Sequence, residues 1–241
     1  MFPAAHPRLP AGTARPRGAV IAGLAAALCA RNPRTRLLVA VDGVDGAGKT
    51  TFADHLAAAL RKSGSRQVLR VGMDDFHNVR GIRYRRGRRS PDGFWLDSYN
   101  LRQFSEYVLN PLISGAPEFR DRGHDLGTDT VLDPPPVPAA ADAVVVIDGL
   151  FLHREELRGS WDYSLFLDVP FGVTAARLAR RDGSPSPSPE KDPGRDRYVG
   201  GQLRYFAAAD PAARADLVLD NSRSGTLEVV TAASVSYRRG R

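Results

Sequence analysis

The stretch Gly43-Val44-Asp45-Gly46-Ala47-Gly48-Lys49-Thr50 matches the pattern Gly-x-x-x-x-Gly-Lys-Thr at every fixed position. Glycines let successive backbone N–H groups turn inward and cradle phosphate oxygens, and the following helix adds the positive end of its dipole. In such a loop the lysine reaches the β- and γ-phosphates, and the threonine hydroxyl faces Mg²⁺. We therefore expect ATP and Mg²⁺ on Gly43, Asp45, Gly46, Ala47, Gly48, Lys49, Thr50 and Thr51.

The segments on either side of this loop have the character that the motif requires. The run Leu37-Leu38-Val39-Ala40-Val41 is short, apolar and followed by glycines, which is typical of a buried parallel strand. A helical pattern then runs from about Lys49 to Lys62 and stops at Gly64. A phosphate loop connects a strand to a helix, so this context supports the motif.

Strands and helices alternate along the rest of the chain. Helices are predicted at about 18–30, 98–112 and 173–181, and further strands at 67–71, 143–147, 165–169 and 217–219. This alternation predicts an α/β fold of the P-loop NTPase type, with three α/β/α layers around a predominantly parallel five-stranded sheet. A lid and a substrate-binding insert complete the predicted architecture.

Two acidic segments follow predicted strands. Met73-Asp74-Asp75-Phe76-His77 ends the second strand, and Ile147-Asp148-Gly149 ends the third. Ligands in open α/β sheets bind beyond the carboxyl ends of the strands. Asp74 is therefore a candidate to accept the proton of an attacking hydroxyl, and Asp148 a candidate magnesium carboxylate. Taken alone, the Asp74-Asp75 pair is also compatible with a helix cap or a turn.

Arginines gather on the predicted helix 173–181. Arg177, Arg180 and Arg181 precede a Ser/Pro-rich loop. On a mobile lid such side chains close over phosphates and neutralise charge in the transition state. An arginine-bearing helix is also common as a solvated face, so both interpretations stay open at this point.

Composition narrows the class of protein. With 241 residues, 42% of them hydrophobic, the chain suits one α/β domain, and the single Cys29 fits a reducing compartment. The formal charge of +7 comes almost entirely from arginine, because the chain has three lysines, and this compositional bias disfavours a nucleic-acid function. Arg15 and Arg17 before the apolar stretch 19–30 imitate a signal peptide, but charged residues follow at once. We expect a cytoplasmic protein without a membrane segment.

In this order the motifs resemble the uridine kinase, phosphoribulokinase and pantothenate kinase branch of the P-loop kinases, over about residues 35–221. The matching segments are 41–51, 74–77, 147–151, 165–168, 177–181 and 215–221. The resemblance implies that Asp74 is the general base, that Asp148 is a magnesium-associated acid and that Arg177 to Arg181 form the lid. Lys49, Arg177 and Arg181 would then be catalytic, and Arg180 would bind the nucleotide.

The resemblance also defines domain boundaries. Residues 1–17 are predicted to be a flexible N-terminal segment, 18–225 the P-loop kinase domain and 226–241 a C-terminal tail. Within the domain, the insert covers about 76–141 and the lid about 177–200. The proline cluster 134–138 and the Ser/Pro stretch 183–194 mark exposed connections.

The acceptor site shows one agreement with uridine kinases and one departure. Uridine kinases hold the base with an aromatic residue and a histidine five positions apart, and Phe119 and His124 have that spacing. The acid that holds the ribose in those enzymes corresponds here to Phe94, unless Asp92 or Asp97 replaces it. The predicted substrate contacts are Asp74, Phe76, His77, Phe119 and His124.

These observations predict an ATP- and Mg²⁺-dependent kinase for a small-molecule hydroxyl, with the 5′-hydroxyl of uridine or cytidine as the first candidate. A kinase for pantothenate or a sugar phosphate is the main alternative, because the basic run 80–89 would suit a phosphorylated acceptor, although the run is equally compatible with a solvated loop. A nucleic-acid-dependent ATPase is a less favoured alternative. A GTPase switch is disfavoured because the sequence has no Asn-Lys-x-Asp motif. The expected partners are ATP and the acceptor, and a homo-oligomer stays open.

Overall fold

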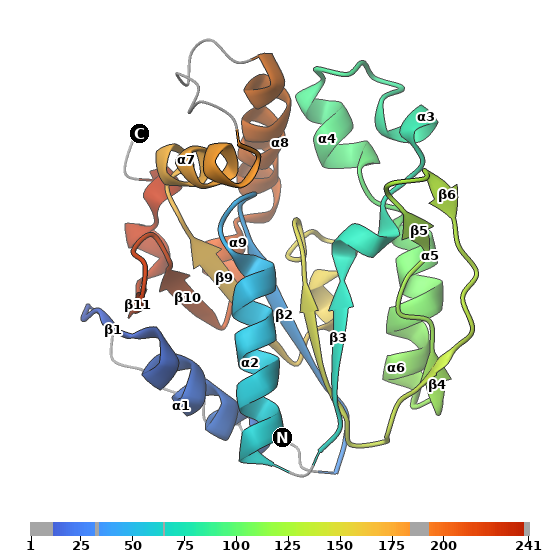
Figure 1. Ribbon diagram of the computed structural model, residues 1–241, viewed down its shortest axis with the longest axis vertical. Helices are drawn as coiled ribbons and strands as arrows, with labels where there is room; N and C mark the ends of the chain where they lie inside the picture. The colour runs from blue at the N-terminus through green and yellow to red at the C-terminus, as the bar shows by residue number, and fades with distance from the viewer. Residues whose placement is uncertain (1–11, 32–33, 65, 184–192, 239–241) are drawn as a thin grey trace.

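A central sheet of seven strands organises the chain, in the order β1-β11-β10-β9-β2-β8-β3. The computed structural model describes residues 12–31, 34–64, 66–183 and 193–238. Five neighbouring strands run parallel: β10 (Leu217–Asp220), β9 (Tyr163–Asp168), β2 (Leu37–Gly43), β8 (Val144–Asp148) and β3 (Val68–Gly72). The predicted parallel five-stranded core of an α/β fold is thereby confirmed (Figure 1).

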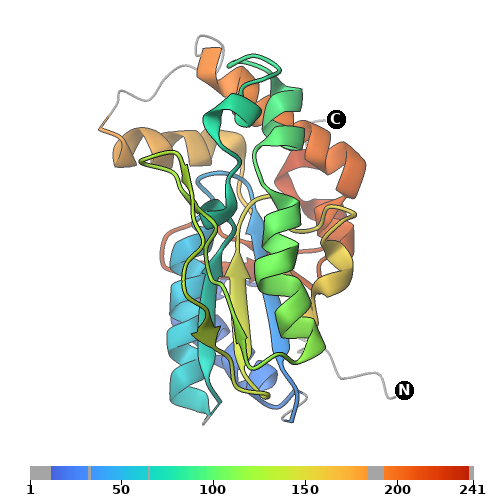
Figure 2. The ribbon, with the colours of Figure 1, turned by 90° about the vertical axis from the view of Figure 1, so that its right-hand side faces the viewer.

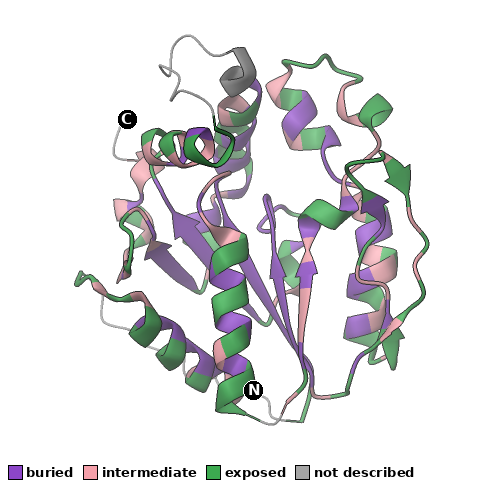
Figure 3. Cartoon of the chain, in the orientation of Figure 1, coloured by how far each residue is buried: buried purple, intermediate pink, exposed green. Residues whose placement is uncertain are grey.

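Helices cover both faces of this sheet. On one face lie α1 (Arg17–Cys29) and α2 (Lys49–Ser63), and on the other lie α8 (Pro193–Ala209) and the helical stretch of the insert (Figure 2). Helix α7 (Phe171–Arg181) lies across the carboxyl ends of the strands, and the short α9 (Pro211–Arg214) leads into β10 (Figure 1). The central strands β2, β8 and β9 are entirely buried between these layers (Figure 3).

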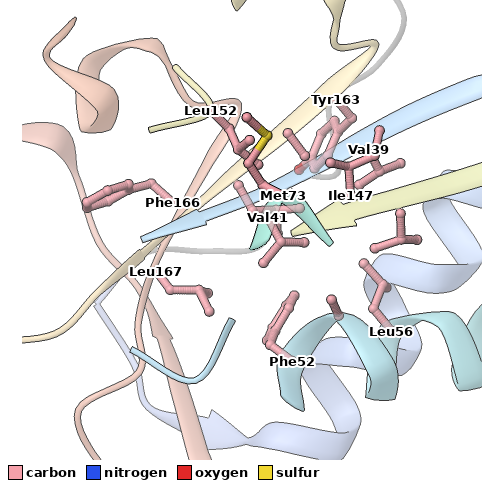
Figure 4. Close-up of a cluster of buried hydrophobic side chains, with 14 of the residues drawn as sticks. Val39, Val41, Phe52, Leu56, Met73, Ile147, Leu152, Tyr163, Phe166 and Leu167 are labelled. Carbon is pink, nitrogen blue, oxygen red and sulfur yellow. The ribbon is translucent and has the colours of Figure 1, made fainter. Parts of the chain in front are cut away.

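The core explains why α2 is held in place. Its buried side chains recur at helical spacing and lie on one face: Phe52, Ala53, Leu56, Ala57 and Leu60. Phe52 and Leu56 face the aliphatic side chains of the central strands (Figure 4). Full burial of each such side chain stabilises the fold by about 1.5–3 kcal/mol. This packing fixes the start of α2 at the end of β2.

The insert between β3 and β8 is built from short elements. These are η1 (Met73–Phe76), α3 (Arg80–Arg83), α4 (Pro91–Asp97), α5 (Leu101–Phe104), a π-helical turn at Ser105–Leu109, α6 (Asn110–Ser114), β4 (Glu118–Phe119), β5 (His124–Asp125), β6 (Thr130–Val131) and β7 (Val137–Pro138). The helix expected at 98–112 thus begins at Leu101 and contains a π turn. Pro111 lacks an N–H for the regular helical ladder, which fits a π turn at this point.

The two ends of the described chain differ from expectation. Arg15 and Pro16 form β1, which pairs antiparallel with Leu227 and Thr226 of β11 (Thr226–Val229). Strand β11 pairs in turn with β10, so part of the expected flexible segment and part of the expected tail extend the sheet. Strands this short carry no hydrophobic period that a sequence could reveal. Residues 1–11 and the lid segment 184–192 lie outside the described residues.

Besides η1, the described residues contain 3₁₀ turns at Arg158–Ser160 (η3), Ala232–Ser234 (η4) and Ser236–Arg238 (η5). Within the described ranges, none of the helices has the length and hydropathy that a bilayer crossing requires.

Candidate active site

The phosphate loop lies at the carboxyl end of β2, between the ends of β8 and β9. Gly46 and Gly48 have positive φ angles of 73° and 82°, and α2 begins directly after them at Lys49. These angles favour glycine because a Cβ atom is strained in this region. The Lys49 ammonium donates a hydrogen bond of 3.0 Å to the carbonyl of Val44, so its charge is held inside the loop.

Residues far away in the sequence support this loop. The side-chain amide of Asn221 donates to the carbonyl of Ala47 at 2.7 Å, and the Gln202 amide oxygen accepts the N–H of Asp45 at 2.7 Å. Helix α7 packs against the loop as well, since a Cβ atom on Gly46 would lie 3.0 Å from Leu178 Cγ. Elements α7, α8 and the end of β10 therefore all hold the loop in its conformation.

Thr50 and Asp148 meet at the start of α2. The Thr50 hydroxyl donates to Asp148 Oδ2 at 2.7 Å, and Arg70 donates to Asp148 Oδ1 at 2.7 Å. The described residues contain no cluster of three or more His, Cys, Asp or Glu side chains that could hold a metal on its own. A hydroxyl and one carboxylate beside a phosphate loop fit Mg²⁺, which keeps several waters and takes its other ligands from phosphates. Thr50 and Asp148 are the residues that would hold it.

Asp74 is an exposed residue of the turn η1, which follows β3. Its Oδ1 accepts a hydrogen bond of 2.8 Å from the phenol of Tyr99. Burial and the charge of Asp74 raise the pKa of Tyr99 well above its usual value, so the phenol stays protonated and remains a donor. The neighbouring Asp75 also has a raised pKa, because of burial and the charge of Asp74.

His77 is tied to the same turn. Its Nδ1 lies 2.7 Å from the carbonyl of Asp74, and since a carbonyl only accepts, Nδ1 carries the proton. Burial lowers the pKa of His77, so the ring is neutral at neutral pH and presents Nε2 as an acceptor. The ring packs on Tyr99 with centroids 4.6 Å apart.

Phe76, by contrast, is fully buried and packs edge-on against Phe104, with ring centroids 5.1 Å apart.

The three arginines of α7 differ in their surroundings. Arg177 donates to the carbonyls of Asn221 and Ser222 at 2.8 and 2.9 Å, so it joins α7 to the end of β10. Arg180 is exposed. The pKa of Arg181 is raised by a hydrogen bond to Asp182 and, more weakly, by the charges of Asp45 and Asp74. Arg181 is exposed and pairs with its neighbour Asp182 at 2.9 Å.

The structure separates Phe119 from His124. Phe119 is buried in β4 and pairs with Val137, and strand β4 lies beside α6 (Figure 1). His124 lies in β5 next to η1, since the adjacent Gly123 donates its N–H to the carbonyl of Asp75 at 2.9 Å. His124 is buried, with Nε2 3.3 Å from Asp129 Oδ1 but without hydrogen-bond geometry. The histidine is therefore near the acidic turn, whereas Phe119 contributes to the core of the insert.

The residues that correspond to the ribose-binding acid of uridine kinases make contacts with other parts of the chain. Phe94 is buried against Phe151 and Tyr198, with ring centroids 5.4 and 4.8 Å away. Asp92 pairs with Arg204 of α8.

The second acidic candidate for the ribose contact, Asp97, binds arginines of the basic run 80–89. Asp97, 1% exposed, accepts from Arg85 at 2.5 Å and from Arg86 at 2.9 Å. Arg83 pairs with Asp129 at 3.4 Å. Much of the basic run 80–89 is therefore tied to acids of the insert.

Sequence reasoning did not single out Tyr99, Gln202 or Arg70. Each acts on a partner that is 25 to 157 residues away, and no local pattern marks such a pair. The resemblance covered Asn221 but predicted no contact for it, and the structure shows that it holds the phosphate loop.

No family model matches the chain. Individual proteins of known sequence do match it. The thymidylate kinase of Xylella fastidiosa is 30% identical over 204 residues, which are 80% of this chain and 92% of that protein. The thymidylate kinase of Xanthomonas campestris (strain B100) is 30% identical over 155 residues, 62% of this chain and 63% of that protein.

Solved structures agree on the fold. The structure of a possible uridine kinase from Bacillus stearothermophilus has a TM-score of 0.65 at 24% identity, covering 82% of this chain and 96% of that one. A provisionally assigned fructose transport system kinase from Silicibacter sp. TM1040 has a TM-score of 0.61 at 26% identity, with 81% and 94% covered. A D-glycerate 3-kinase from Cryptococcus neoformans has a TM-score of 0.56 at 12% identity, with 88% and 99% covered.

The fold and the phosphate loop define a P-loop kinase, a phosphotransferase that phosphorylates a small metabolite with ATP. Within that class, thymidylate kinases are distant sequence relatives of the chain, and solved structures of a possible uridine kinase and of a D-glycerate 3-kinase share its fold.

Proposed function

We propose that this kinase transfers the γ-phosphoryl group of ATP to a hydroxyl of its substrate, and that a nucleoside such as uridine or cytidine is the first candidate. The observation that carries the proposal is the Asp74 carboxylate, which lies on the turn after β3 and is oriented by the Tyr99 phenol at 2.8 Å. An alcohol acceptor needs a group that takes its proton, and an oriented carboxylate serves that role.

In the proposed mechanism, Asp74 acts together with residues that bind the metal and residues that stabilise the transferring phosphoryl group. ATP with Mg²⁺ supplies the phosphoryl group and the metal charge that neutralises it. Thr50 and Asp148 hold the metal, and Lys49 and Arg181 stabilise negative charge on the transferring group. Asp74 orients the acceptor hydroxyl and accepts its proton, which avoids a strongly basic alkoxide before transfer.

A second candidate acceptor is a nucleoside monophosphate. It is supported by the thymidylate kinase relative that matches over 92% of its own length. An acceptor phosphate needs cationic partners and no base. The adjacent carboxylates of Asp74 and Asp75 favour an uncharged alcohol instead, because they repel a phosphate.

The test measures ATP consumption with Mg²⁺ over a panel of acceptors, in which thymidine and thymidylate form a matched pair. Uridine, cytidine and thymidine represent nucleosides, and thymidylate represents the monophosphates. Pantothenate, glycerate, fructose and sugar phosphates cover the other alcohols. Phosphorus NMR identifies the product, and Lys49→Ala gives the background. Formation of a nucleoside 5′-monophosphate supports the proposal, and turnover of thymidylate without turnover of thymidine replaces it with the second candidate.

A further inference from the structure

The first residue of α1 reaches the loop that follows β10. Arg17 is held there by its backbone, because its N–H donates to the carbonyl of Gly225 at 2.9 Å. The preceding strand β1 pairs with β11, so the side chain of Arg17 extends from a fixed point (Figure 1). Its Nη2 donates a hydrogen bond to Oδ1 of Asn221. A contact over 204 positions of the sequence thereby joins the N-terminal strand to the residue that holds the phosphate loop.

Asn221 touches the phosphate loop with its side-chain amide. The residue is 1% exposed, and its Nδ2 donates to the carbonyl of Ala47 at 2.7 Å. A Cβ atom on Gly48 would lie 3.3 Å from the same nitrogen, so the amide also lies against the last glycine of the motif. Gly48 has a φ of 82° and directly precedes Lys49. The amide therefore supports the turn from which Lys49 and α2 begin.

Arg17 determines which end of this amide faces the loop. The side chain of asparagine ends in an acceptor oxygen and a donor nitrogen. If the amide turned over, Oδ1 would face the carbonyl of Ala47, and two acceptors repel each other. A guanidinium group only donates, so Arg17 can bind Oδ1 but not Nδ2. The hydrogen bond from Arg17 therefore keeps Nδ2 on the side of the phosphate loop.

The backbone of Asn221 is held independently of Arg17. Its N–H donates to the carbonyl of Asp168 at 3.0 Å, and its own carbonyl accepts from Arg177 at 2.8 Å. Loss of the Arg17 guanidinium should therefore release the side-chain amide without displacing the residue. This separation allows the role of the guanidinium to be measured by substitution.

The position of Arg17 is unfavourable for a cation in other respects. Arg17 is the first residue of α1, at the positive end of the helix dipole. Burial and, second to it, the charge of Arg177 lower the pKa of Arg17, so the two guanidinium groups lie close enough to repel each other. Neither feature stabilises α1. The hydrogen bond to Asn221 is an interaction of this side chain that offsets them.

We propose that Arg17 is a positioning residue for the bound nucleotide: it orients the Asn221 amide, and the amide holds Ala47 and Gly48 in the conformation that binds the phosphates. A loop that is already held in its bound conformation loses less conformational entropy on binding and therefore binds more tightly. Arg17 acts through Asn221 and makes no contact with the nucleotide in this role. The role is independent of which acceptor the kinase phosphorylates.

The test measures the affinity for the non-hydrolysable ATP analogue AMP-PNP, with Mg²⁺, by isothermal titration calorimetry. Arg17→Gln should raise the dissociation constant by about tenfold, which is the effect of one hydrogen bond from a charged group. Arg17→Lys keeps a cation that only donates and should recover part of this loss. Arg15→Gln removes the same charge two residues earlier and should stay within about twofold of the wild type. An unchanged affinity in Arg17→Gln, or an equal loss in Arg15→Gln, overturns the proposal.

A double-mutant cycle tests the route through Asn221. Asn221→Ala removes the amide, so Arg17→Gln in that background should change the AMP-PNP affinity by less than about twofold. Losses that add in the double variant would mean that Arg17 acts by another route, and they overturn the proposal. Urea unfolding without nucleotide shows that each variant is folded under the titration conditions. Arg17→Lys takes the place of Arg17→Gln in the cycle if the glutamine variant does not fold.

Inorganic tripolyphosphate separates an effect on the phosphate loop from an effect on the base of the nucleotide. It carries the phosphates of ATP without the base, and its affinity is measured by competition with AMP-PNP. If Arg17 positions the phosphate loop, Arg17→Gln should weaken the binding of both ligands by the same factor. A loss for AMP-PNP alone would assign Arg17 to the base and overturn the proposed role.

Discussion

The phenol of Tyr99 donates a 2.8 Å hydrogen bond to Asp74 Oδ1. Tyr99 is 4% exposed and comes from the segment between α4 and α5, whereas Asp74 lies on the turn after β3. The bond therefore joins the insert to the edge of the sheet where the phosphate loop lies. It leaves Oδ2 of an exposed carboxylate for an acceptor hydroxyl.

Asp74→Asn should reduce turnover by about 10²–10⁴-fold, because the amide cannot accept the acceptor's proton. The affinity for AMP-PNP should stay within about twofold, since no contact of Asp74 holds the phosphate loop. Steady-state kinetics and analogue binding are the measurements. Asp92→Asn, which changes an exposed acid of the same insert, is the matched control. Unchanged turnover in Asp74→Asn would remove this residue from the role of base.

Tyr99→Phe should lower kcat by about tenfold and leave KM for the acceptor nearly constant. The ring still packs on His77, but the carboxylate loses the donor that orients it. Tyr107→Phe, which removes a phenol that binds the exposed Asp133, serves as the control. If KM rises while kcat is unchanged, the phenol acts in binding and not in orienting Asp74.

Removal of Mg²⁺ with a chelator should abolish phosphoryl transfer, and added Mg²⁺ should restore it. Asp148→Asn should raise the Mg²⁺ concentration for half-maximal turnover by about tenfold or more, since a charged metal partner is lost. Asp54→Asn removes the other acid that pairs with Arg70, at 3.1 Å, and lies outside the proposed metal site. An equal shift in both variants would assign the effect to Arg70 and not to the metal.

Asp97→Asn should destabilise the fold by about 1–3 kcal/mol at pH 7, because Arg85 and Arg86 lose their charged partner. Burial alone would raise the pKa of Asp97, but the hydrogen bond from Arg85 and the charges of Arg85 and Arg86 outweigh it and lower the pKa. The contribution is thus present above the unfolded pKa of about 3.9 and is lost as pH falls through the folded value.

The difference in unfolding free energy between wild type and Asp97→Asn should therefore shrink between pH 7 and pH 3. Urea unfolding at several pH values measures it. Glu106→Gln, in an exposed pair with Arg102, should cost less than about 0.5 kcal/mol throughout. A difference that grows towards pH 3 would contradict the assignment.

Gly149→Ala should be among the most disruptive small substitutions. A Cβ atom there would lie 2.2 Å from Met73 Cβ, which precedes Asp74, so the two acidic loops of the site would have to separate. We expect a loss of about 1–3 kcal/mol, as overpacking produces, and a fall in turnover. Gly23→Ala in α1 has open space and should stabilise by about 0.5–1 kcal/mol. Thermal unfolding of both variants measures these changes in stability, and an unchanged stability in Gly149→Ala would contradict the prediction.

The parts of the molecule that the sequence could predict are those with local signals. The phosphate loop has its own motif, and each central strand is a buried apolar run, so the family and the parallel core were predictable and are confirmed. The roles of Asp74, Asp148 and the α7 arginines stay predictions. The structure brings Asp148 to Thr50, and it shows Arg177 bonded to backbone carbonyls beside β10.

The remaining parts depend on long-range packing. Phe119 and His124 have the right spacing in the sequence, but spacing does not determine which strand each residue joins or what that strand packs against. The contact between Gln202 and Asp45 spans 157 residues. Strand β1 has two residues and is defined by its pairing with β11, since it has no pattern of its own.

That two-residue strand has a consequence for how copies of the protein meet. The last strand of an open sheet presents unpaired N–H and C=O groups that can template a neighbour's strand. Here the last strand is β1, and one of its residues is Pro16, which has no N–H to offer. Among the described residues, β1 therefore offers few free backbone groups that a second molecule could pair with. The N-terminal strand thereby limits edge-to-edge pairing on this side of the sheet, whereas β3 is the strand at the opposite edge.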